Sequence, residues 1–173
     1  MKHFAIIMAI MAMVGCNSNE QPLYTVDQLD IERYEGFWYE IAKLPNRFEA
    51  GLTDVVAYYQ TIGEDKIEVI NAGYNLKKGK MEQSEGIAII DEPGKLRVSF
   101  FRPFYGDYYI MKVDQCVEGE YQWALVGSPD RKYLWLLSRT QEMEEGVFNY
   151  LVEYAAEEGF DVSNLEMTIH RKN

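Results

Sequence analysis

Cysteine and histidine are scarce in this chain of 173 residues, which contains two of each. Two cysteines cannot build a disulfide-rich scaffold, and two histidines nearly exclude a zinc site made of histidine ligands. Basic residues are also outnumbered, because 17 Lys and Arg stand against 28 Asp and Glu. The resulting net charge of −11 disfavours a nucleic acid as partner. No apolar run reaches the roughly 20 residues that a membrane-spanning helix needs.

Aromatic side chains, in contrast, are abundant: they make up 14% of the chain, and 13 of them are Tyr. Hydrophobic residues account for 47% and charged residues for 26%, a composition typical of a globular protein rather than a disordered one. The length predicts one domain that buries about two-thirds of the surface of its unfolded chain. The many aromatic residues indicate either a large core or a lined cavity.

The N-terminal residues resemble a secretion signal. A basic start at Lys2 is followed by an apolar run over 4–14 and by Gly15-Cys16. The sequence Met13-Val14-Gly15-Cys16 resembles the lipobox of bacterial lipoproteins, in which the Cys is lipidated and becomes the new N-terminus. The alternatives are a signal cleaved elsewhere and a buried core helix. Asn17 after the Cys resembles the arrangement that permits sorting to the outer membrane, where we expect a lipid-anchored protein on the periplasmic face.

These features divide the chain into three parts. We predict a lipoprotein signal peptide over 1–15, a polar tether over 16–26 and a single barrel domain over 27–173. No internal repeat, low-complexity tract or domain linker follows residue 30. No feature specifies an oligomeric state.

The body of the chain reads as a series of short strands. Segments of about 7 to 11 residues, rich in Val, Ile, Tyr, Phe and Thr, alternate with turn signals. The turn signals lie at 63–66, 77–80, 91–94, 102–107, 118–120 and 128–130. Together with 38–44, these segments make eight candidate strands. Such regular spacing is typical of an antiparallel sandwich or an up-and-down barrel.

Alternation within the strands predicts which side chains share a face. Val55, Ala57 and Tyr59 form one such set, and Leu96, Val98 and Phe100 form another. The last strand, which carries Trp135 and Arg139 on one face, is apolar on both faces and must therefore be covered on its outside.

One amphipathic helix is predicted to provide that cover. Thr140 is its expected N-cap and Gly159 its C-terminal cap. Its apolar stripe consists of Met143, Val147, Tyr150, Leu151 and Tyr154. Beyond the helix, Met167 and Ile169 alternate with polar residues and suggest a last short strand.

Several motifs together resemble the lipocalin family. Gly36-Phe37-Trp38 resembles its first signature, and Arg139 lies where the family has its late Arg. Further matches to bacterial outer-membrane lipocalins are Phe48-Glu49, Gly73-Tyr74-Asn75, Gln83-Ser84-Glu85-Gly86, Val98-Ser99-Phe100-Phe101, Pro103-Phe104-Tyr105-Gly106 and Glu158-Gly159-Phe160-Asp161. The resemblance covers roughly residues 27 to 172.

This resemblance implies a fold: an all-β, eight-stranded antiparallel up-and-down β-barrel, with one C-terminal α-helix packed on the outside. The barrel is expected to enclose a cavity open at one end. The Trp38 indole should plug the closed end beneath the Arg139 guanidinium, an interaction worth about 2 kcal/mol when desolvated. Both residues would then be structural.

The resemblance also implies a ligand, namely a fatty acid or lysophospholipid, and no cofactor. Tyr105 and Trp135 match positions that line the pocket in related lipocalins. Alternation adds six further candidates for the pocket wall: Val55, Ala57, Tyr59, Leu96, Val98 and Phe100. The alternative for these six is that they belong to an ordinary barrel core. Burial of a 16-carbon chain contributes on the order of 10 kcal/mol before entropic losses. Arg47, Arg102 and Lys112 are candidate cations for the head group.

Catalytic motifs are lacking in the sequence, which has no Gly-x-Ser-x-Gly, phosphate loop or Cys-x-x-Cys. His170 reads as a surface-strand histidine, and Cys116 as an inert thiol. We therefore expect a binding protein that stores or transports a hydrophobic ligand in cell-envelope maintenance. The alternatives are a lipid-modifying enzyme, for which Glu40 and Tyr105 are the nameable candidates, and a scaffold lipoprotein with a filled barrel.

Overall fold

The computed structural model describes residues 21–115 and 119–171. The predicted signal peptide over 1–15, the predicted lipidation site Cys16 and the thiol of Cys116 lie outside these described residues.

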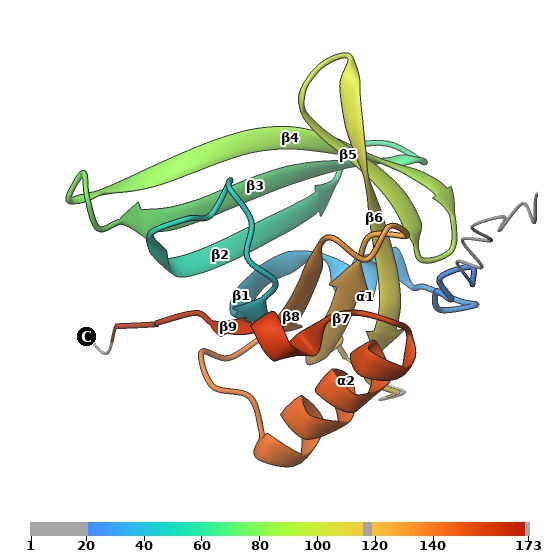
Figure 1. Cartoon of the computed structure of the whole chain (residues 1–173). Helices are drawn as coiled ribbons and strands as arrows, with labels where there is room; N and C mark the ends of the chain where they lie inside the picture. Colours follow the sequence, from blue (N-terminus) through green and yellow to red (C-terminus); the bar gives the residue numbers. More distant parts are fainter. Residues whose placement is uncertain (1–20, 116–118, 172–173) are drawn as a thin grey trace, which may run out of the picture.

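Eight antiparallel strands form a closed barrel (Figure 1), as the resemblance implied. Each strand pairs with the next in the chain, and β8 pairs with β1 to complete the circle. The strands are β1 (Gly36–Lys43), β2 (Leu52–Thr61), β3 (Lys66–Asn75), β4 (Lys80–Glu92), β5 (Lys95–Phe101), β6 (Phe104–Val113), β7 (Trp123–Gly127) and β8 (Leu134–Ser138). The six predicted turn regions overlap the connections from β2 to β8, because Gly, Pro and Asp residues there interrupt the alternating apolar pattern.

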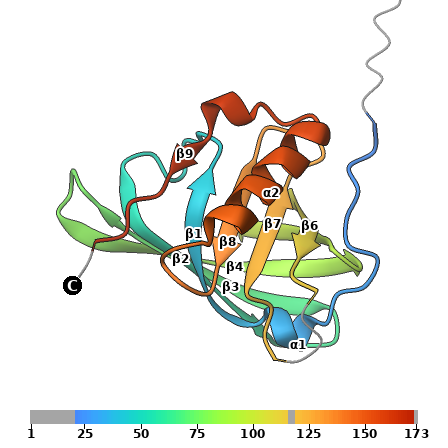
Figure 2. The same cartoon turned by 90° about the horizontal axis from the view of Figure 1, so that it is seen from below.

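The outside of β1, β7 and β8 is covered by one helix, α2 (Glu145–Glu157), as Figure 2 shows. Leu151 and Ala155 are fully buried against this outer layer, which includes Leu125 and Leu136 of the barrel wall. Gly159 ends the helix with φ +90°, a left-handed conformation that glycine adopts without strain.

The predicted helix start is wrong. The helix begins at Glu145 with Glu144 as N-cap, whereas Thr140 lies in the preceding connection and donates a hydrogen bond to the Glu142 carbonyl. Thr140 is held there because its backbone N–H also bonds to the Ser138 hydroxyl. A hydroxyl residue that completes a local turn in this way no longer caps the helix.

The C-terminal segment completes the wall where β1 and β2 separate. β1 pairs with β2 only over 36–39, and beyond this point β9 (Glu166–Met167), which follows the short helix η1 (Val162–Asn164), pairs with Ala42 and Lys43. The segment continues past β9, since Thr168 donates its N–H to the Ile41 carbonyl and Asp54 donates its N–H to the Ile169 carbonyl.

His170 belongs to this segment and is not the surface histidine that the sequence suggested. Its Nε2 lies 2.7 Å from the Glu40 carbonyl, and its ring meets the Tyr39 ring edge-on at 5.5 Å between centroids. The alternation of side chains explains the difference: Met167 and Ile169 are exposed, so Thr168 and His170, which alternate with them, turn toward β1.

The N-terminal end of the described chain also packs on the barrel. Leu23 is buried in the outer layer, and Val26 donates its backbone N–H to the Ile110 carbonyl. The packed domain therefore begins upstream of residue 27, within the predicted tether. The short helix α1 (Ile31–Tyr34), capped by the Asp30 carboxylate, then leads into β1.

The barrel has two different ends. The end at α1 is the closed end, where β1 starts and the β2–β3, β4–β5 and β6–β7 connections lie. The opposite end, here called the open end, carries the β1–β2, β3–β4, β5–β6 and β7–β8 connections. No helix among the described residues has the length and apolar character to cross a membrane.

Candidate functional site

The barrel floor is built from Trp38, which is fully buried. Its position follows from Gly36, whose φ of +89° lets the chain turn from α1 into β1. The indole Nε1 donates to the Tyr34 carbonyl at 2.8 Å, and the Arg139 guanidinium lies 3.9 Å from the ring centroid. The predicted indole plug beneath the late Arg is therefore present.

Above this floor, the inner-face side chains of β5 and β8 become less covered toward the open end. On β5, Leu96 is 1% exposed whereas Val98 and Phe100 are partly exposed. On β8, Leu137 is buried and Trp135 is partly exposed. β2 differs, because Tyr59 is buried and Ala57 is not, but Val55, which lies nearer the open end, is buried again. Side chains thus fill the lower part of the barrel and leave the upper inner face of β5 and β8 accessible.

Most of the predicted wall residues lie where alternation placed them. The inner cluster, or residues packed against it, includes Tyr59, Leu96, Ala57, Val98, Phe100 and Trp135. Val55 is buried as well, and a side chain on the facing Gly73 would touch its methyl group.

Tyr105 does not join this group. Its ring lies beneath the Arg97 guanidinium at 5.5 Å, on the strand face opposite to that of Val98 and Tyr108. The parity of β6 explains this placement, because Tyr108 packs against the inner cluster and residues an odd number of positions away point outward. The expectation that Tyr105 lines the barrel interior is therefore not met.

A chain of three tyrosine hydroxyls crosses the interior instead. Tyr108 Oη lies 2.8 Å from the Tyr34 hydroxyl and 2.8 Å from the Tyr59 hydroxyl. Burial raises the pKa of all three phenols, so the hydroxyls stay protonated and satisfy one another. Sequence analysis missed Tyr108, although its parity with Ile110 on β6 could have identified it.

A buried carboxyl group lies near the upper wall. Glu40 is 2% exposed and accepts a short hydrogen bond from the Thr168 hydroxyl. Burial, followed by the nearby charge of Glu49, raises the pKa of Glu40 to about 8. Near neutral pH, the Glu40 carboxyl group therefore stays largely protonated.

Glu49 links the β1–β2 connection to this interior. Its carboxylate accepts hydrogen bonds from the Trp135 indole at 3.2 Å and from the Asn46 side-chain amide at 2.6 Å. The connection is thereby fixed to Trp135, a predicted wall residue of β8. Glu49 belongs to the Phe48-Glu49 motif, but its role as a partner of Trp135 was not predicted, because the contact spans 86 residues.

The structure places the three candidate head-group cations at different sites. Arg47 and Arg102 are exposed at the open end, in the β1–β2 and β5–β6 connections. Lys112 is wrong as a candidate: a β-bulge between Ile110 and Lys112 turns it to the outer face, where its Nζ lies 4.3 Å from the Tyr154 ring centroid of α2.

A hollow of about 210 Å³ brings two of the predicted residues together. Phe100 and Arg102 both line it, together with the acidic residues Glu68 of β3 and Glu85 of β4. Ser99 lines the same hollow, and its buried hydroxyl has no hydrogen-bond partner among the described residues. A second hollow, of about 340 Å³, lies outside the barrel beside the start of α2.

The two candidate catalytic residues, Glu40 and Tyr105, lie apart in the structure. Glu40 is buried in the wall, whereas Tyr105 lies beside Arg97 on the β5–β6 hairpin. Within 21–115 and 119–171, no group of three or more His, Cys, Asp or Glu residues could hold a metal ion. The arrangement is that of an eight-stranded cup with a plugged floor and an apolar, aromatic upper wall.

Comparison with known proteins gives the family. Residues 29–170 match the family model of the lipocalin-like domain, so the chain belongs to the lipocalin family. It is 43% identical over 160 residues to the outer membrane lipoprotein Blc of Escherichia coli K12, and the match covers 90% of this chain and 88% of that one. It is 36% identical over 168 residues to the Blc lipoprotein of Vibrio cholerae, with 95% and 96% covered.

Solved structures agree on the fold. Insecticyanin from the tobacco hornworm Manduca sexta superimposes with a TM-score of 0.70 at 21% identity, over 88% of this chain and 86% of that one.

Proposed function

We propose that this protein is anchored to the outer membrane through lipidated Cys16 and binds a fatty acid or a lysophospholipid in the upper part of its barrel. It would store or transport that lipid in maintenance of the cell envelope, from the periplasmic face. The observation that carries the proposal is the gradient along the inner face, where apolar residues lose their cover between Leu96 and Phe100. An apolar, aromatic wall with few polar groups suits a single acyl chain.

The relatives support the location. The Blc proteins of Escherichia coli and Vibrio cholerae are named outer membrane lipoproteins, and each aligns with at least 90% of this chain. Together with the lipobox-like Gly15-Cys16, this favours an N-terminal lipid anchor here.

Polar groups near the top of the wall suit the head of such a ligand. The Arg102 guanidinium suits a carboxylate or phosphate, and it shares with Phe100 a hollow whose lining also includes Glu68 and Glu85. Glu49, beside the Trp135 indole, suits an ammonium group. A lysophospholipid carries both charges, whereas a fatty acid uses only the cation.

Displacement of a fluorescent fatty acid from the purified protein tests this proposal. We expect both palmitate and a lysophospholipid to displace the probe. Trp135→Ala should weaken binding about tenfold, or roughly 1.4 kcal/mol. Trp123→Ala is the matched control, because Trp123 packs in the outer layer against Tyr150 of α2.

The two variants separate binding from folding. If Trp123→Ala weakens probe binding as much as Trp135→Ala does, the ligand does not occupy the barrel. If folded wild-type protein takes up no probe at all, the barrel is a scaffold and the proposal fails.

A further inference from the structure

The open end of the barrel carries large apolar side chains that face solvent. Phe101 is 81% exposed, Phe104 is 78% exposed and Phe48 is 66% exposed. Leu76 and Met81 of the β3–β4 hairpin are also exposed. Apolar side chains gathered on one end of a protein mark a contact with a membrane or a partner.

The charge at this end differs from that of the whole chain. We define the open-end surface as residues 45–51, 76–82, 101–105 and 128–133. It contains seven Lys or Arg and three Asp or Glu residues, whereas the rest of the chain holds the other 10 basic and 25 acidic residues. Two of the three acidic groups are paired within the surface, Glu82 with Lys78 and Asp130 with Lys132.

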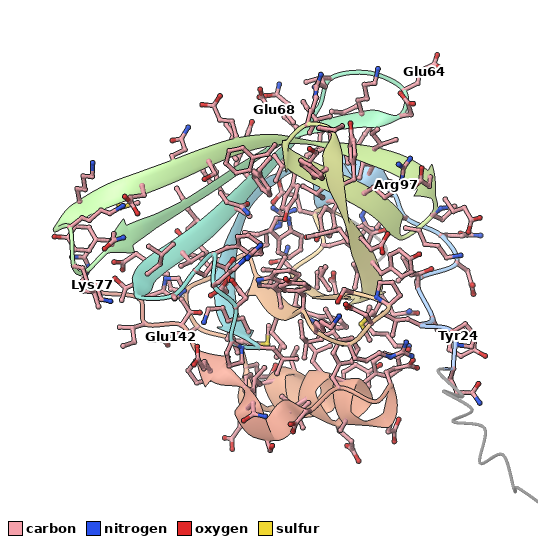
Figure 3. All side chains as sticks on the ribbon, turned by 45° about the horizontal axis from the view of Figure 1, so that its top comes forward. Tyr24, Glu64, Glu68, Lys77, Arg97 and Glu142 are labelled. Carbon is pink, nitrogen blue, oxygen red and sulfur yellow. The ribbon has the colours of Figure 1, made fainter. Side chains whose placement is uncertain are left out.

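This separation runs along the barrel. Figure 3 shows Lys77 at the tip of the β3–β4 hairpin and Glu64 at the β2–β3 connection, toward the other end of the strands. A strongly acidic protein that presents a basic, aromatic end is electrostatically complementary to an anionic surface at that end only. Lys and Arg side chains close to an anionic bilayer are attracted to its surface.

The start of the described chain lies at the same end. The Arg131 Nη2 donates to the Gln21 carbonyl at 2.7 Å, and Arg131 belongs to the β7–β8 connection of the open-end surface. Cys16 precedes Gln21 by five residues, which span at most about 18 Å even when fully extended. An anchor on Cys16, as proposed above, therefore keeps this end close to the membrane.

We propose that the open-end surface docks on an anionic lipid bilayer, with Phe48, Phe101 and Phe104 in the interface and the basic residues against the head groups. The barrel then opens toward the bilayer itself. A single-chain lipid passes between the membrane and the upper wall without its acyl chain crossing bulk water. The occupant of the surface is thus the membrane that holds the anchor.

Depth-dependent quenching tests the orientation. The lipidated protein is reconstituted into phosphatidylcholine vesicles, with or without phosphatidylglycerol, that contain lipids brominated on the acyl chains. Phe104→Trp is compared with Phe37→Trp, a matched control because Phe37 is 62% exposed at the closed end. After subtraction of wild-type emission, we expect the bromolipids to quench the added indole of Phe104→Trp several-fold more than that of Phe37→Trp when phosphatidylglycerol is present.

A pair of charge variants tests the electrostatic part. In the Phe104→Trp background, Arg47→Gln with Arg102→Gln removes two charges from the open-end surface. Lys66→Gln with Lys95→Gln removes two from the closed end. We expect only the first pair to reduce quenching, and only in phosphatidylglycerol vesicles.

The outcomes separate this inference from the proposed function. Equal quenching of the two added indoles overturns the docking on the bilayer. Crosslinking of two copies through their open ends also overturns it, and so does quenching that requires an added protein. The mass of the Cys16 peptide reports the anchor separately, and probe displacement reports the barrel. Anchored, ligand-binding protein with equal quenching therefore refutes the docking alone.

Discussion

The Arg139 guanidinium lies 3.9 Å from the centre of the Trp38 ring and joins three parts of the chain around it. It donates to the carbonyls of Tyr121, Phe37 and Arg33. The last barrel strand is thereby fixed to the first strand, to α1 and to the β6–β7 connection. One side chain thus closes the floor of the barrel.

We expect Arg139→Ala to lower the free energy of unfolding by about 3 kcal/mol, since it removes a desolvated cation–π contact and leaves carbonyls without donors. Arg139→Lys should recover only part of this loss, because an ammonium lacks the planar fork. Denaturant unfolding provides the measurement. Arg47→Ala is the control: its guanidinium lies 5.0 Å from the Phe48 ring at an exposed site, so a comparable loss there would contradict the role of burial.

The buried Glu40 carboxyl makes stability depend on pH. Its folded-state pKa is raised to about 8, first by burial and then by Glu49, so the folded protein holds a proton that the unfolded chain releases above its ordinary pKa. Stability therefore falls as pH rises from about 5 to 8, by on the order of 3 kcal/mol. We expect Glu40→Gln to flatten this dependence in denaturant titrations across that range. An unchanged slope would show that another group is responsible.

The chain of tyrosine hydroxyls predicts that removal of one hydroxyl lowers stability even though the ring keeps its shape. Tyr108→Phe removes the hydroxyl that bonds both Tyr34 and Tyr59. Two buried hydroxyls then lack a partner, and we expect the free energy of unfolding to fall by about 2 kcal/mol. Tyr105→Phe, at an exposed site of the same strand, should change it by less than about 0.5 kcal/mol. Similar losses in the two variants would argue against the hydroxyl chain.

Close contact between barrel and outer layer predicts a clash at Gly127. A Cβ there would lie 2.6 Å from the Phe160 ring and 2.9 Å from the Met111 sulfur. We expect Gly127→Ala to destabilise the protein by about 1–3 kcal/mol, measured by thermal or denaturant unfolding. Gly106→Ala is its control, because a Cβ at Gly106 meets nothing within 4 Å. A neutral effect at Gly127 would mean that the segment after α2 shifts freely.

Most of the fold could be predicted because local sequence patterns determine where the strands begin and end and which side chains share a face. Turn residues separate the strands, and alternation identifies one face of each, so the order of eight strands and the inward direction of Tyr59, Leu96 and Trp135 follow from the sequence. Prediction failed where a local choice was decided by contacts from elsewhere. The bulge after Ile110 turned Lys112 outward, and Thr140 joined a turn instead of the helix.

The sequence by itself determined the alternating strands, the Gly36-x-Trp38 start, the amphipathic helix and the excess of acidic residues. Only the tertiary structure decided that Glu49 bonds to Trp135, that Glu40 shares its buried site with Thr168, and that the basic and aromatic connections gather at one end of the barrel. The Glu49–Trp135 contact joins residues 86 positions apart, and the Glu40–Thr168 contact joins residues 128 positions apart. Closure of the barrel brings them together, and neither periodicity nor local propensity encodes which distant side chains meet.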